Sequence, residues 1–85
     1  MNLYLSANPA SNTETKIFFT MKNEGNAQVS LMDPLGREVH MLLNGRAVAG
    51  QNIIPIDPSK LTSGTYFIRV NADGLTATRK LIITK

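Results

Sequence analysis

Apolar residues in this chain come in short runs in which every second position is apolar, and Gly, Pro, Asn and Asp separate the runs. An alternation of period two is typical of β-strands that bury one face, whereas a helix repeats its apolar positions every three to four residues. The pattern predicts an all-β chain with seven strands, at Asn2–Ser6, Thr15–Met21, Ala27–Met32, Glu38–Asn44, Gln51–Ile56, Thr65–Ala72 and Leu75–Thr84.

The same alternation predicts which side chains face the core. In the second strand we expect Ile17, Phe19 and Met21 to be buried, with Phe18 and Thr20 on the opposite face. The other predicted inward-facing residues are Ala27, Val29 and Leu31, then Tyr66, Ile68 and Val70, and finally Leu75, Ala77, Leu81 and Ile83.

The segments between the strands carry turn-forming residues. Asn23–Asn26 tolerates positive φ and predicts a hairpin between the second and third strands. In Asp33–Arg37, Asp begins the turn, Pro fixes φ at the next position and Gly36 allows the reversal. Asn44–Gly50 is expected to be a loop, and Asp73-Gly74 is a strong signal for a two-residue hairpin.

Two prolines and one longer connection refine this picture. Pro9, which follows the first strand, and Pro55, within the fifth, lack the backbone N–H that a sheet ladder needs. We therefore expect the first strand at a sheet edge and the fifth at an edge or bulge. Asp57–Gly64 begins with Asp-Pro and ends with Gly, which predicts one helical turn held to the core by Leu61.

The 85 residues support one domain, residues 1–85. A domain of this length buries only about 60% of the surface of its unfolded chain. Apolar residues make up 42% of the sequence and charged residues 18%, which suits a folded globule. Because two small sheets must each bury one face, we predict a small seven-stranded antiparallel β-sandwich, immunoglobulin-like in kind.

Charge and residue types exclude several function classes. The chain has no cysteine and a single histidine, so it offers neither disulfides nor thiolate metal sites. The net charge is +3, but the basic residues are scattered and only Arg79 and Lys80 are adjacent. Nucleic-acid binding favours clustered cations with interleaved aromatic residues, so we do not expect it here.

The sequence also lacks a recognisable catalytic or metal centre. His40 has no partner histidine or cysteine, and its position in the alternation places it at solvent or on a sheet face. Asp33, Asp57 and Asp73 each stand before Pro or Gly, which favours turn capping over calcium binding or paired carboxylates. Ser63-Gly64 lacks the second glycine of a nucleophile elbow. We expect no enzyme activity, no cofactor and no metal ion.

Four blocks, in order along the chain, resemble one known family. The first is Asn8-Pro9-Ala10-Ser11-Asn12, where Ala7 departs from the family's usual first proline. The second runs from Val29 to Val39 and contains an aliphatic strand, Asp33, Gly36-Arg37 and a further strand. The third, Leu61–Val70, resembles a Leu-x-x-Gly-x-Tyr block, and the fourth, Thr78–Lys85, is a basic and aliphatic strand that ends in Lys.

Together these blocks resemble the C-terminal sorting domain, type A, of the Bacteroidetes type IX secretion system. That resemblance implies a non-catalytic signal, covalently attached behind a cargo protein, that the outer-membrane translocon and a sortase-like surface peptidase recognise. The peptidase usually removes the domain, here upstream of about Leu3, and the cargo is released or joined to anionic lipopolysaccharide. The implied route runs through the periplasm to the cell surface or medium, without membrane insertion of the domain.

The first residues, Met1–Leu5, have no basic flank and no long apolar stretch. We therefore expect an upstream segment to direct export, with Met1 standing in place of a longer precursor.

The last strand is our first candidate for the recognition surface, because basic residues flank an aliphatic run and offer both charge steering and strand addition. The candidate residues there are Arg79, Lys80, Leu81, Ile82, Ile83 and Lys85. A second candidate is the Gly36-Arg37 pair, whose arginine could bind a carboxylate or phosphate. We interpret the remaining motif residues as structural: Asn8, Pro9, Asn12, Asp33, Gly64 and Tyr66.

Two other functions stay open on sequence alone. An immunoglobulin-like or fibronectin-like spacer would hold neighbouring domains apart and would have chain on both sides. A carbohydrate-binding module usually grips sugar rings with exposed aromatics, and only Tyr4, Phe18 and Phe67 could face outward here, in a chain without Trp.

Overall fold

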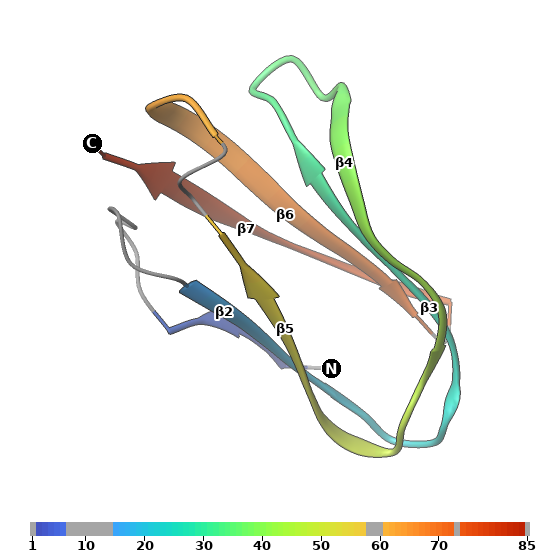
Figure 1. The fold of residues 1–85 in the computed structure, drawn as a ribbon. Coiled ribbons are helices and arrows are strands. Elements are labelled where there is room, and N and C mark those ends of the chain that lie inside the picture. The colour runs from blue at the N-terminus through green and yellow to red at the C-terminus, as the bar shows by residue number, and fades with distance from the viewer. Residues whose placement is uncertain (1, 7–14, 58–60, 73, 85) are drawn as a thin grey trace.

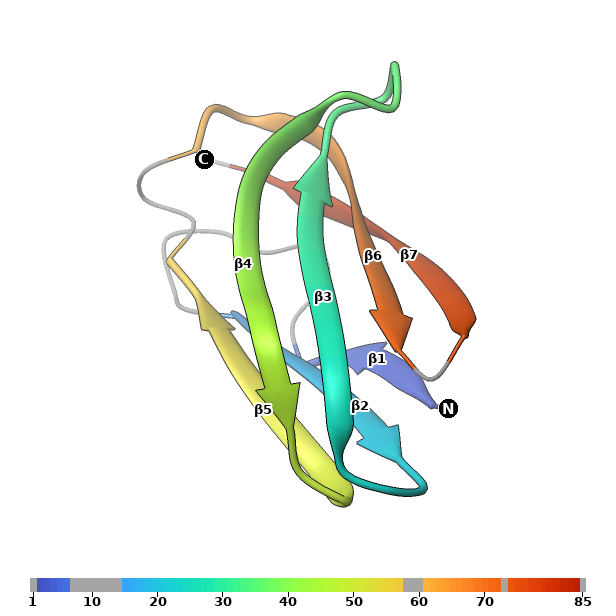
Figure 2. The same cartoon turned by 90° about the vertical axis from the view of Figure 1, so that its right-hand side faces the viewer.

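Two antiparallel sheets face each other in the computed structural model, which describes residues 2–6, 15–57, 61–72 and 74–84 (Figure 1). The smaller sheet has the order β1 (Leu3–Leu5), β2 (Thr15–Met21), β5 (Gly50–Ile56). The larger has the order β4 (Glu38–Ala47), β3 (Gly25–Met32), β6 (Gly64–Ala72), β7 (Leu75–Ile83), and Figure 2 shows its four strands side by side. The predicted seven-stranded antiparallel β-sandwich is confirmed.

The strand order is that of an immunoglobulin-like sandwich. Neighbours in sequence share a sheet only at β1–β2, β3–β4 and β6–β7, while the other connections cross between sheets. The predicted hairpin at Asn23–Asn26 is therefore wrong, because β2 pairs with β1 and β5 and β3 pairs with β4 and β6. The two strands instead turn their apolar faces toward each other across the core. Turn residues alone do not distinguish this crossing from a hairpin.

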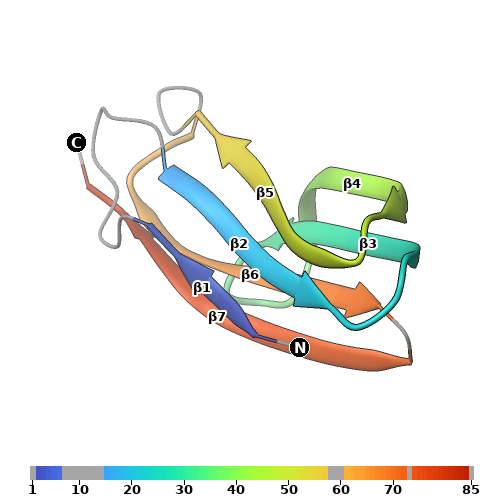
Figure 3. The same ribbon diagram turned by 90° about the horizontal axis from the view of Figure 1, so that it is seen from below.

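The core residues lie between the two sheets, whose ribbons Figure 3 shows from below. The inward-facing residues predicted for β2, β3 and β6 are all buried. In β7 the prediction holds only for Leu81 and Ile83, because Leu75 is 55% exposed and Ala77 is half-buried. The neighbouring border strand of the other sheet, β1, has three residues and leaves the first half of β7 uncovered (Figure 3).

The turns mostly follow the prediction. Asp33–Arg37 reverses the chain between β3 and β4, and Ala72 pairs with Leu75 in the β6–β7 hairpin, whose Asp73 lies outside the described residues. The predicted loop at Asn44–Gly50 is too long, since β4 continues to Ala47 and its Gly45 pairs with Ala27. A glycine within a strand weakens the sequence signal without ending the strand when the partner strand supplies the pairing.

The connection from β5 to β6 holds Leu61 in the core, as expected. The helical turn predicted in Asp57–Gly64 rests mainly on residues 58–60, which lie outside the described residues, and the described flanks are not helical. The edge positions predicted for the first and fifth strands are confirmed, since β1 and β5 border the three-stranded sheet.

Candidate recognition surfaces

The last strand, β7, combines core anchors with exposed cations. Leu81 and Ile83 are 0% and 1% exposed, so their side chains pack in the core and are not presented to a partner. Ile82 is half-buried, and Arg79 and Lys80 are exposed. Lys85 lies outside the described residues. Of the candidates in this strand, the structure therefore places Arg79 and Lys80 fully at the surface.

Arg79 and Lys80 do not form one patch on a single sheet face. Successive side chains of a strand point to opposite faces, so these two cations lie on opposite sides of the sheet border. Lys80 pairs with Phe67 in the outward-facing register of β6, while Arg79 pairs with Ile68 in the register that faces the core. A partner that meets both cations must approach the border of the sheet rather than its face.

The turn at Asp33 is closed by its own aspartate and arginine. Asp33 Oδ1 accepts hydrogen bonds from the backbone N–H groups of Leu35 (3.0 Å) and Arg37 (2.9 Å). Asp33 Oδ2 accepts one from Arg37 Nε at 2.8 Å, and the N–H of Gly36 donates to the Asp33 carbonyl at 3.0 Å. Gly36 takes φ 84°, a conformation that side-chain-bearing residues rarely adopt. Turn capping by Asp33 is confirmed.

These hydrogen bonds also set the electrostatics of the turn. The pKa of Asp33 is lowered, first by the hydrogen bond from the Arg37 backbone N–H. Desolvation opposes this as the next largest effect, and the Arg37 guanidinium and the Leu35 N–H lower the pKa further. The Arg37 side chain is 74% exposed, and its Nε is already bound to Asp33. The arginine therefore presents the rest of its guanidinium to solvent from a fixed position rather than as a free side chain.

Tyr66 has a structural role in its motif block. Its hydroxyl donates to the Thr62 carbonyl at 2.9 Å and lies 3.0 Å from Thr62 Oγ1. A tyrosine near the start of this strand whose hydroxyl bonds backbone a few residues upstream is the tyrosine corner of immunoglobulin-like domains. The Leu61-x-x-Gly64-x-Tyr66 spacing thus matches a device that fixes the entry into β6. Asn8, Pro9 and Asn12, from the first block, lie outside the described residues.

The three aromatics considered for a sugar platform do not share a surface. Tyr4 and Phe18 stack on each other with ring centroids 4.9 Å apart and planes 10° apart. The Tyr4 hydroxyl accepts a hydrogen bond of 2.8 Å from Gln51 Nε2. Phe67 belongs to the other sheet. Tyr4 and Phe18 therefore pack against one another as partners on the neighbouring strands β1 and β2. They offer no flat platform together with Phe67.

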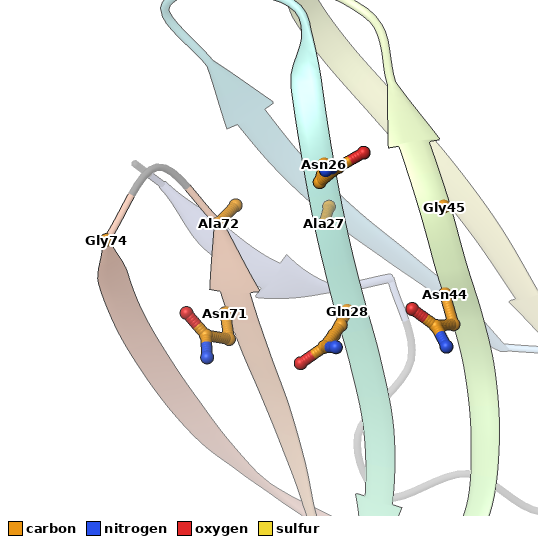
Figure 4. A pocket seen from close by; sticks show the side chains of 8 residues that line it. All are labelled: Asn26, Ala27, Gln28, Asn44, Gly45, Asn71, Ala72 and Gly74. Atoms are coloured by element: carbon orange, nitrogen blue, oxygen red, sulfur yellow. The ribbon is translucent and has the colours of Figure 1, made fainter.

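A polar hollow on the outer face of the four-stranded sheet was not anticipated from sequence. Its described walls include four exposed carboxamides, one of them Asn26 (Figure 4). We call the other three, Asn44 on β4, Gln28 on β3 and Asn71 on β6, the carboxamide row. Gln28 pairs with Asn44 on one side and with Asn71 on the other. Each residue stands at an outward position of its strand, but only the strand order shows that the three are neighbours.

Metal and membrane features are absent from the part of the chain that the structure describes. No group of His, Cys, Asp or Glu residues within it could hold a metal ion. No described helix has the length and apolar character needed to span a membrane. His40 is exposed on β4, as its place in the alternation predicted.

The fold, the tyrosine corner and the closed Asp-x-x-Gly-Arg turn define an immunoglobulin-like β-sandwich that carries ordered motif blocks. Residues 7–84 match the family model of the secretion system C-terminal sorting domain. The chain belongs to that family, the C-terminal sorting domains of type IX secretion. No curated protein matches the chain. A sorting domain of this kind acts as part of a cargo protein, interacts with the type IX machinery and is exported toward the cell surface or extracellular space.

Proposed function

We propose that this domain is the non-catalytic signal that carries an attached upstream cargo through the type IX outer-membrane translocon. The family match over residues 7–84 is the observation that carries the proposal. At the surface, a sortase-like peptidase then cuts the chain upstream of Leu3 and releases the cargo from the signal. The domain itself contributes recognition and no chemistry.

We further propose that β7 is the main contact of the machinery, with the Arg37 turn as the second. β7 borders the larger sheet, and its pairing with β6 runs without a register shift from Leu75 to Ile83. Leu81 and Ile83 anchor the strand, so Arg79 and Lys80 project from a fixed backbone. Fixed cations at a sheet border can both steer an acidic partner and hold it in register.

Reversing the two charges tests the contact without disturbing the core. We would fuse the domain behind a periplasm-directed reporter in a bacterium with type IX secretion and introduce Arg79→Glu with Lys80→Glu. Surface delivery of the reporter is expected to fall by about tenfold or more, since an attraction becomes a repulsion. Deleting the whole strand end would be a poorer test, because we expect the loss of the buried Leu81 and Ile83 to unfold the domain.

The matched control is Lys16→Glu with Lys22→Glu, which makes the same change in net charge at two exposed positions of β2 and the loop after it. Delivery by the control should equal that of the unaltered domain. Equal delivery by all three fusions would refute the contact at β7. Mass analysis of the released reporter locates its C-terminus, and a cut inside the β1–β2 sheet region would contradict cleavage upstream of Leu3.

A further inference from the structure

We propose that the carboxamide row is a binding site for a neutral carbohydrate, a function separate from sorting. The three side chains lie level with one another on β6, β3 and β4, on the outer face of the sheet (Figure 4). Neighbouring strands are spaced by about 4.8 Å, so the amide groups form a row with that repeat. A single sugar ring with hydroxyls around its rim spans two members of such a row.

The hydrogen-bonding capacity of the row is unused within the described residues. Asn44, Gln28 and Asn71 are exposed, and none of their carboxamides bonds another described residue. Each carboxamide carries an acceptor oxygen beside an NH2 donor group. Gly45 and Gly74 add no side chain to the hollow, and a Cβ built at either would meet nothing within 4 Å. The row therefore stands open to a ligand.

The chemistry of the lining selects the class of ligand. The chain has a net charge of +3, yet the described residues that line the hollow are all uncharged: Asn26, Ala27, Gln28, Asn44, Gly45, Asn71, Ala72 and Gly74. A neutral lining gives no preference for an ionised ligand and favours one that both donates and accepts hydrogen bonds. Sugar hydroxyls do both.

An extended peptide fits this place less well. Peptide backbones bind to sheets at a border, where they continue the ladder, and gain specificity from apolar pockets for alternate side chains. The hollow lies on a face, and its described lining has no apolar side chain larger than alanine, with Ala27 and Ala72 themselves buried. Because the described lining has no aromatic ring for stacking, the sugar is held through its hydroxyl groups and the expected affinity is millimolar.

Titration of the isotope-labelled domain with neutral oligosaccharides tests the site. The probes are maltopentaose, cellopentaose and mannopentaose at millimolar concentrations, followed by NMR of the backbone and side-chain amides. At least one probe should shift the side-chain NH2 signals of Gln28, Asn44 and Asn71 in a saturable way. The triple variant Gln28→Ala, Asn44→Ala, Asn71→Ala should bind at least about tenfold more weakly.

The matched control is Asn23→Ala, which removes an exposed carboxamide from the loop between β2 and β3. This variant should bind as the unaltered domain does. A single variant, Asn71→Ala, keeps the test valid if the triple variant fails to fold. Absence of saturable shifts with all three sugars, equal binding by the triple variant, or shifts by an extended alanine-rich peptide where sugars give none would overturn the proposal.

Discussion

The two border strands of the four-stranded sheet, β4 and β7, differ in how they are paired and in what they bury. β7 pairs with β6 at every residue, whereas the β3–β4 register shifts twice and leaves Val39 and Leu42 without a partner in β3. Bulges bend a border strand and increase its twist, which discourages pairing with another chain. β4 is thus protected at a border where Val39 and Met41 are exposed.

The two strands also differ in how they are held to the core. β7 ends on two fully buried side chains, Leu81 and Ile83, and apart from Leu75 at its start its exposed positions carry Thr, Arg and Lys. β4 buries only Ala47 and keeps Leu42 and Leu43 half-buried. A strand with firm anchors and a polar exterior can be exposed to a receptor without inviting aggregation, and this difference supports β7 rather than β4 as the contact of the machinery.

The largest expected effect is on the free energy of unfolding, when a leucine that packs β7 or β4 against the core is replaced by alanine. Leu81→Ala should lower the free energy of unfolding by about 2–5 kcal/mol, because it leaves a cavity at a fully buried position. Leu42→Ala, the same change at a half-buried position of β4, should cost about 1–2 kcal/mol. Urea unfolding followed by circular dichroism measures both. Equal losses would show that β4 is anchored as firmly as β7.

A smaller effect is expected at Tyr66, which pairs with Leu81 of β7 in the register. Tyr66→Phe removes the hydroxyl that donates to the Thr62 carbonyl and should cost about 1 kcal/mol. The control Tyr4→Phe also removes a hydroxyl, but Tyr4 is 48% exposed and its bond to Gln51 competes with water. We expect the control to change stability by less than about 0.5 kcal/mol. A larger loss at Tyr4 would contradict a tyrosine corner that supports β7.

Local patterns were enough to predict β2, β6 and β7. In β2 and β6 the apolar residues alternate cleanly, so strand type and buried face follow from the pleat. In β4 the run Met41-Leu42-Leu43 breaks the alternation, and the two bulges of the structure account for it. The sequence cannot place such bulges, because they depend on which residues of β3 lie opposite.

Local patterns could not predict which strands pair within each sheet, or in what register. The Asn23–Asn26 segment has hairpin residues but crosses between sheets, and the strands that it joins, β2 and β3, each bury an apolar face in the shared core. The exposure of Leu75 depends on the short length of β1. The carboxamide row likewise depends on register, for its three residues are far apart in sequence and look like ordinary outward positions.

The smallest effect we predict concerns the turn that leads into β4. Asp33 has a pKa below the ordinary value of 3.8 in the folded state, because the Arg37 backbone N–H and guanidinium favour its charged form. A carboxyl with a lowered folded pKa stabilises the fold above its unfolded pKa and loses that contribution as pH falls through its folded value. The urea midpoint should therefore fall on acidification below pH 3.8, and Asp33→Asn should flatten that part of the curve.

The control Glu24→Gln removes an exposed carboxylate 3.4 Å from Arg46 and should change the midpoint little. If Asp33→Asn leaves the acid limb as steep as before, the turn does not stabilise the start of β4 through its charge, and the bulged border depends on β3 pairing alone.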